Sequence, residues 1–238
     1  MELAGGGAVT VCKCKAIGDH SFMKGRHWMT VCSHSWRIWC HNKVRDIIAE
    51  MYKSLHIPAE TEVSGRYTHI NSHGEVRPAD VLPSQSATGA DMEQALDVAI
   101  TDPTMKTALD VKSDRFPLSA AKDREGKKIS EFRPMMREAA EAGAPIEKIP
   151  LVMETTGAFG IRMQKWWKEM KKLEAEFRSG RPLSLQDQGL EHTWSANVWS
   201  TFQRQKLSMG VARLQAEGII KKISQNLPEG AQFYKTAA

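Results

Sequence analysis

Two short apolar runs in this chain each contain an aspartate, and these runs limit what it can fold into. Asp80 lies within residues 79–82 and Asp97 within residues 95–101, and a proline follows each run closely. Runs of this length that end at proline or serine predict strands rather than helices. Because burying an unpaired carboxylate is unfavourable, each aspartate needs either a solvated strand edge or a cation beside it.

A third carboxylate, Glu154, follows the apolar run "PLVM". Carboxylates grouped on neighbouring strands are typical ligands of Mg²⁺ or Mn²⁺, with a substrate phosphate completing the metal shell. Asp80, Asp97 and Glu154 are therefore candidate metal ligands and catalytic residues, and the alternative is that they occupy strand edges. A nearby lysine would neutralise charge in the transition state, although each lysine taken alone is more typical of a solvated helix face. The lysines within reach in the sequence are Lys112, Lys122, Lys127 and Lys128.

The first forty residues hold all four cysteines, interspersed with histidines. The start of the chain has no basic segment followed by an apolar stretch, so we expect no secretory signal, and thiols or a metal site rather than disulfides. The spacing C-x-C-x5-H-x11-C is compatible with tetrahedral Zn²⁺. His27 competes with the histidine of this set, Cys40 and His41 are further candidates, and unrelated thiols and histidines are the alternative. The predicted Zn²⁺ ligands are Cys12, Cys14, His20 and Cys32.

Apolar periodicity and turn residues predict an α/β fold, with a small mixed sheet flanked by helices and a helical tail at the C-terminus. The predicted helices cover residues 41–57 with His41 or Asn42 as N-cap, 119–143 with a break or kink near Pro134 and an end at Gly143, 161–180, and 193–223. The predicted strands form a hairpin over residues 59–82 and continue at 95–102 and from 146, and residues 104–118 form an irregular connection. The predicted domains are a zinc-knuckle-like segment over 1–40, an α/β domain over 41–160 and a basic helical extension over 161–238.

Charge is distributed unevenly along the chain. Residues 1–56 carry +4, residues 57–160 carry −5 and residues 161–238 carry +6. Basic flanks around an acidic centre are typical of a protein that binds a polyanion and gathers carboxylates around a metal, although an ordinary mildly basic surface gives the same balance. No apolar run approaches the ~20 residues that span a bilayer, so we expect no membrane partner.

The strings "CKC", "GDH", "HNKVRD", "RPADV", "LDVAITDP" and "PLVMETTGAFG" occur in order over roughly residues 12–160. In this series the chain resembles the C-terminal endonuclease segment of reverse-transcriptase polyproteins from non-LTR retrotransposons. Those segments open with a Cys/His zinc knuckle and continue into a restriction-like, or PD-(D/E)XK-type, nuclease domain. The knuckle departs from the family pattern, since "SFMKGRHWMTV" separates "GDH" from Cys32.

The resemblance implies roles for individual residues. Asp80 stands at the first metal-binding aspartate, and Asp97 opens the D-x-K element, in which Ala99 occupies the lysine position. Some relatives carry that lysine on the following helix, where Lys128 or Lys127 would match. Glu154 resembles a further acidic position, and His41 and Asn42 match the "HN" that opens the first helix, where this fold can present a polar group beside the metal.

The function implied by the resemblance is a metal-dependent DNA endonuclease that acts in the nucleus, with DNA and the parent polyprotein or other retroelement domains as partners. The alternatives are a catalytically inactive nucleic-acid-binding remnant of the same fold and an unrelated small zinc-binding interaction protein. Trp166 and Trp167 could stack on bases, but their spacing with Met163 and Met170 is more typical of core packing. The candidate phosphate-binding residues are Arg66, Arg77, Lys165, Lys168, Lys171 and Lys172.

Overall fold

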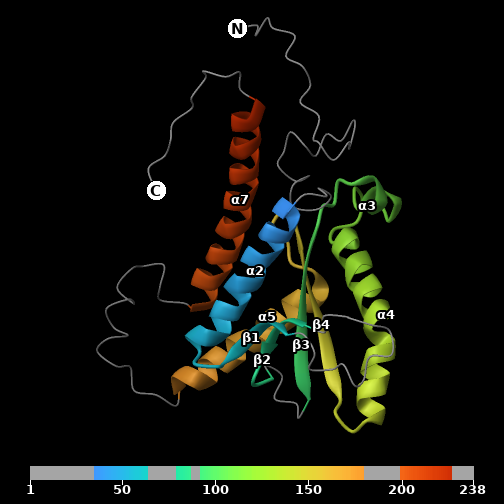
Figure 1. Cartoon of the computed structure of the whole chain (residues 1–238), viewed down its shortest axis with the longest axis vertical. Helices are drawn as coiled ribbons and strands as arrows, with labels where there is room; N and C mark the ends of the chain where they lie inside the picture. The colour runs from blue at the N-terminus through green and yellow to red at the C-terminus, as the bar shows by residue number, and fades with distance from the viewer. Residues whose placement is uncertain (1–34, 64–78, 87–91, 180–198, 227–238) are drawn as a thin grey trace, which may run out of the picture.

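The computed structural model describes residues 35–63, 79–86, 92–179 and 199–226. Within them lies a four-stranded mixed sheet of order β1-β2-β3-β4 (Figure 1). The pairs β1–β2 and β2–β3 are antiparallel, and β4 runs parallel to β3. The predicted antiparallel strands within residues 59–82 and the two later strands are therefore confirmed, and the turn predicted between the first two lies outside the described residues. The strands are β1 (Ala59–Val63), β2 (Ala79–Pro83), β3 (Glu93–Thr101) and β4 (Ile146–Glu154).

Helices cover both faces of this sheet, in agreement with the predicted α/β class. Side chains alternate along β3, so Leu96 and Val98 face one side of the sheet while Asp97 and Ala99 face the other. The first pair packs in the main core with the helices of one layer, and Ala99 packs against α4. None of the described helices is long and apolar enough to cross a membrane. The longer helices are α2 (Ser35–Ser54), α4 (Ser119–Glu141), α5 (Ile161–Ser179) and α7 (Trp199–Asn226).

Helix α2 begins at Ser35, several residues before the predicted N-cap. Cys40, Val44 and Ile48 are four residues apart and fully buried, so the apolar stripe of this helix starts within the segment assigned to the zinc knuckle. Burial, followed by the negative charge of Glu217, raises the pKa of Cys40 to about 12. In this structure Cys40 is therefore a buried residue of the main core, and its place among the further zinc candidates stays a prediction.

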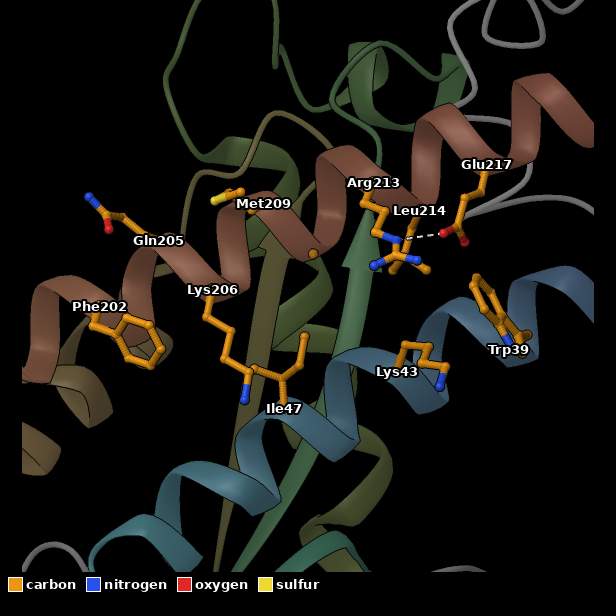
Figure 2. A pocket seen from close by; sticks show the side chains of 11 residues that line it. Trp39, Lys43, Ile47, Phe202, Gln205, Lys206, Met209, Arg213, Leu214 and Glu217 are labelled. Atoms are coloured by element: carbon orange, nitrogen blue, oxygen red, sulfur yellow. Dashed lines mark hydrogen bonds and ion pairs between the residues drawn. The ribbon is translucent and has the colours of Figure 1, made fainter. Parts of the chain in front are cut away.

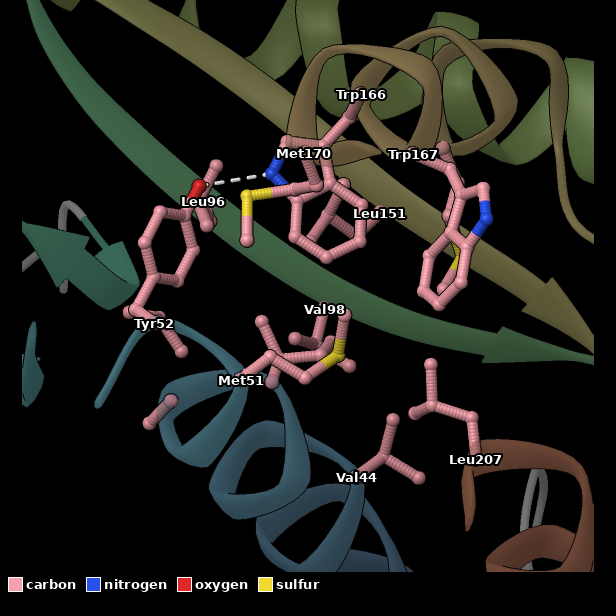
Figure 3. Close-up of a cluster of buried hydrophobic side chains, with 14 of the residues drawn as sticks. Val44, Met51, Tyr52, Leu96, Val98, Leu151, Trp166, Trp167, Met170 and Leu207 are labelled. Carbon is pink, nitrogen blue, oxygen red and sulfur yellow. Dashed lines mark hydrogen bonds between the residues drawn. The ribbon is translucent and has the colours of Figure 1, made fainter. Parts of the chain in front are cut away.

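The main core contains the two adjacent tryptophans of α5 (Figure 3). Trp166 is buried, and its indole Nε1–H donates a hydrogen bond to the Tyr52 hydroxyl at 2.8 Å. Trp167 lies edge-on to Phe159 and stacks on Trp199. The prediction that this pair packs in the core is confirmed, and neither ring is exposed for stacking on bases.

Helix α7 packs along the outside of α2. Gly210 permits the close approach, since a Cβ atom there would lie 2.9 Å from Ile47 Cδ1. Between the two helices is a groove of about 710 Å³ that is lined by Trp39, Phe202 and basic side chains (Figure 2). Two basic residues of this groove form ion pairs, Lys206 with Glu50 and Arg213 with Glu217, and the Lys43 ammonium lies over the Trp39 ring.

Helix α4 is continuous through Pro134, so of the predicted break or kink the break does not occur. Pro134 and Ser130 are both exposed, and water can satisfy the Ser130 carbonyl that the proline cannot bond. The predicted end of the helix is confirmed: Gly143 has φ +76°, and the Ala144 N–H donates to the Ala139 carbonyl, as in a Schellman motif. The connection before α4, expected to be irregular, includes the short helix α3 (Lys106–Asp110).

Glu125 ties α4 to the start of α5. Its buried Oε1 accepts a hydrogen bond from the Arg162 N–H at 2.9 Å, which satisfies a free donor in the first turn of α5. Burial raises the pKa of Glu125, and the backbone N–H groups of α5 act in the opposite direction. The contact depends on Gly160, where a Cβ atom would lie 2.4 Å from Glu125 Oε1.

We predict that Gly160→Ala lowers the free energy of unfolding by about 1–3 kcal/mol, because the new methyl group would displace this carboxylate. Urea denaturation measures the change. The matched control is Gly126→Ala, an exposed position inside α4 with no atom within 4 Å of its Cβ, which should be neutral or stabilise by up to about 1 kcal/mol. Equal effects of the two substitutions would show that the hydrogen bond between Glu125 and the Arg162 N–H does not stabilise the fold.

Candidate functional site

Asp97 lies in the middle of β3 and points toward α4, where it meets a lysine. Its side chain is 8% exposed, and the Lys128 Nζ lies 3.0 Å from Oδ2 and 3.3 Å from Oδ1. Lys128 itself is only 17% exposed. A charged group this deep is stabilised only by a close partner of opposite sign, so the pair fixes the position of α4 over β3.

Lys148 is a second lysine at this site, and it comes from the neighbouring strand β4. Its side chain is completely buried, with Nζ 3.8 Å from Asp97 Oδ1 and 3.6 Å from the centre of the Phe132 ring. Burial lowers the pKa of Lys148 to about 8, while the negative charges of Asp97 and Asp80 act to raise it. Lys148 was not among the residues predicted from the sequence, although a lysine directly before the apolar residues 149–153 was the available signal.

Asp80 approaches the same place from β2. Its Oδ2 accepts a hydrogen bond from the Val98 N–H at 2.7 Å, beside Asp97, and its Oδ1 lies 3.2 Å from His41 Nε2. Burial acts to raise the pKa of Asp80, but the His41 contact, the Val98 N–H and the charge of Lys148 hold it below its ordinary value. Asp80 is therefore ionised at neutral pH.

These residues form one group, which we call the carboxylate–lysine cluster: Asp80, Asp97, Lys128 and Lys148. Two negative and two positive charges balance within it. Lys148 and Asp97 lie at its base, and Asp80 and Lys128 are partly exposed at its opening. His41 lies at the rim beside Asp80, in agreement with the polar group expected near the start of the first helix.

The structure separates the two lysines that the sequence left as alternatives. Lys127 Nζ pairs with Asp123, one turn earlier on the outer surface of α4, at 2.7 Å. Adjacent residues of a helix are rotated by about 100°, so only one of the two can face β3. That residue is Lys128.

Glu154 does not join the cluster. Asp97 is paired with Pro150 in the β3–β4 register and Thr101 with Glu154, so the glutamate lies four residues, or about 13 Å, further along the sheet. There it is buried near Thr156 and the Ala121 N–H in the first turn of α4. Burial raises the pKa of Glu154, and the Ala121 N–H acts in the opposite direction. The prediction that three carboxylates meet at one metal is not supported, because Glu154 occupies the N-terminal end of α4 instead.

The carboxylate oxygens of the cluster suit a metal ion that the protein coordinates only in part. Across the described ranges, no group of three or more His, Cys, Asp and Glu side chains is arranged to hold a metal ion. Asp80 and Asp97 nevertheless supply two carboxylates around one position. Mg²⁺ is commonly bound by one or two protein carboxylates, with waters and substrate phosphates as the remaining ligands. The cluster fits such a cation, and it does not fit one held by protein ligands alone.

Of the predicted zinc ligands and phosphate-binding residues, those that the structure describes do not belong to the cluster. The zinc candidates Cys12, Cys14, His20, His27 and Cys32 lie outside the described residues, and so do Arg66 and Arg77. The remaining candidates are exposed on α5, the helix that packs against the sheet face opposite Asp97. They are Lys165, Lys168, Lys171 and Lys172, of which Lys172 pairs with Glu169.

Comparison of the sequence with models of protein families and with curated proteins finds no match.

We predict that Lys128→Met lowers the free energy of unfolding of the metal-free protein by about 1–3 kcal/mol, because it removes the closest partner of a buried carboxylate. Lys127→Met is the matched control and should change it by less than about 0.5 kcal/mol, since its ion pair is solvated. Chemical denaturation of both variants checks the difference. Indistinguishable values would show that the Lys128–Asp97 pair does not stabilise the fold.

Proposed function

We propose that this chain is a divalent-metal-dependent DNA endonuclease domain with a restriction-endonuclease-like fold. The observation that carries the proposal is the meeting of Asp80, Asp97 and Lys128. These residues come from two adjacent strands and a following helix, and the sequence predicts Asp80 and Asp97 as metal ligands and Lys128 or Lys127 as the catalytic lysine. Their separation in the sequence is large, so their meeting is not a consequence of local structure.

In this proposal Asp80 and Asp97 hold Mg²⁺ or Mn²⁺ at the opening of the cluster. When bound, the metal would lower the pKa of a water molecule and counter the charge on the scissile phosphate. The ammonium group of Lys128 would stabilise negative charge on the phosphate, because it lies at the opening beside Asp97. His41 would hold Asp80 in place through its contact with Oδ1.

The position where the family carries its lysine is closed in this chain. Ala99 is buried against Ala121 and Val152 beneath the first turns of α4. A lysine side chain at residue 99 would have to displace this helix. Lys128 reaches Asp97 from the helix instead, which supports a catalytic lysine on α4.

A catalytically inactive nucleic-acid-binding remnant is the second candidate function. The observation that favours it is the loss of one carboxylate, since Glu154 lies near the start of α4 and not at the cluster. The proposed endonuclease must therefore work with two carboxylates. The zinc-binding interaction protein rests on cysteines and histidines outside the described residues.

A plasmid-nicking assay tests the proposal. We expect the full chain to convert supercoiled DNA to the nicked form with Mg²⁺ or Mn²⁺ and not with EDTA. Asp97→Asn should lower the rate by ~100-fold or more, because it removes a metal ligand while keeping the shape of the side chain. Asp123→Asn, on the outer face of α4, is the control and should leave the rate unchanged.

Circular dichroism of each variant shows whether the fold is retained. Folded wild-type protein that binds DNA without metal-dependent nicking would favour the inactive remnant. Nicking that persists in folded Asp97→Asn protein would remove Asp97 from the mechanism and overturn the proposed site.

A further inference from the structure

Lys148 is an unusual residue for the interior of a strand. Lysine is almost never fully buried without a partner, because an ammonium group loses its hydration there. The Lys148 side chain is nevertheless 0% exposed, in a strand whose following residues, 149–153, are apolar and buried. Something in its surroundings must compensate for the lost hydration.

Two kinds of interaction compensate the Lys148 ammonium for its lost hydration. The Phe132 ring lies 3.6 Å from the ammonium nitrogen, a distance at which the electron-rich face of the ring attracts a cation. The carboxylates of Asp97 and Asp80 supply the opposing charge. The Lys148 ammonium is 3.8 Å from Asp97, whereas Lys128 is at 3.0 Å, so Lys148 is held by the field of both aspartates rather than by one short ion pair.

A divalent cation bound by Asp80 and Asp97 would be attracted by the same two negative charges that stabilise the Lys148 ammonium. The cluster is neutral without metal, so adding Mg²⁺ leaves two positive charges in a partly buried space. Part of this excess is repulsion between the metal and the Lys148 ammonium, which cannot swing into solvent because α4 covers it. The negative charge of phosphates in a bound polyanion would offset the excess positive charge.

We propose that Lys148 is a built-in counter-cation that competes with divalent metal for the Asp80–Asp97 pair and lowers its metal affinity. This inference rests on the metal site of the proposed function, but not on catalysis at that site. Lys148 stabilises the two carboxylates in the metal-free protein and weakens their attraction for the metal. It is a positioning residue, since its buried ammonium group does not reach the opening where substrate would bind.

Titration calorimetry of the full chain with Mn²⁺, at a single neutral pH and without DNA, tests the inference. We expect Lys148→Met to bind Mn²⁺ about 5- to 100-fold more tightly than the wild type, because a competing charge is removed from the site. Lys148→Arg keeps the charge and should not gain affinity. Lys127→Met, which removes an exposed charge of the same helix that carries Lys128, should bind as the wild type does. Lys148→Gln provides a second neutral variant if the methionine variant does not fold.

The outcomes separate this inference from the proposed function. Tighter Mn²⁺ binding by the neutral Lys148 variants, abolished by adding Asp97→Asn, supports the counter-cation even if no variant nicks DNA. Unchanged or weaker binding by folded Lys148→Met and Lys148→Gln overturns it, whether or not the wild type is a nuclease. Absence of Mn²⁺ binding by the wild type and by both neutral variants overturns it as well, together with the metal site.

Discussion

The buried charge of Asp97 is the constraint on which the arrangement of this fold depends. A carboxylate in the central region of β3 is tolerated because Lys128 and Lys148 approach it from a helix and from the adjacent strand. These contacts join β3, β4 and α4, which are separated along the chain but packed together. Charge balance thus adds specificity to the face of the sheet on which Ala99 and Val152 pack against Ala121 of α4.

Two other buried carboxylates place the helices that surround the cluster. Glu125 accepts hydrogen bonds at the start of α5, and Glu154 lies against the first turn of α4. Each satisfies backbone N–H groups that a helix leaves free at its N-terminus, where a negative charge is also favoured by the helix dipole. Since α4 carries Lys128, the glutamate at its start helps to set where that lysine lies. Buried carboxylates in this chain therefore have two roles: Asp97 pairs with lysines, whereas Glu125 and Glu154 accept hydrogen bonds at the N-termini of helices. The groups that surround each carboxylate determine its role.

Local patterns in the sequence predicted most of the strands and helices, because apolar spacing and turn residues determine these locally. They also predicted that Asp80 and Asp97 lie on adjacent strands. Glu154 was misplaced because an apolar run followed by an acid reveals a strand end but not the register between β3 and β4. Lys148 was missed because its burial depends on Phe132 and Asp97, which are distant in the sequence. The early start of α2 was missed because Cys40 was interpreted as a possible ligand rather than as the first residue of an apolar stripe.

The hydrogen bond from the Val98 N–H to Asp80 gives this aspartate a second role in the architecture. Residue pairing between β2 and β3 is confined to Val81 and Leu96, so the Asp80 carboxylate acts as a side-chain rung that extends the ladder between these strands. A ligand that pulled the Asp80 carboxylate outward would break its hydrogen bond with the Val98 N–H and so weaken the contact between β2 and β3. The same hydrogen bond restrains the carboxylate in its position. Replacing Asp80 removes a structural tie together with a charge. Asp97, by contrast, ties β3 to α4 and β4 through the ammonium groups of Lys128 and Lys148 rather than through a backbone N–H of the sheet.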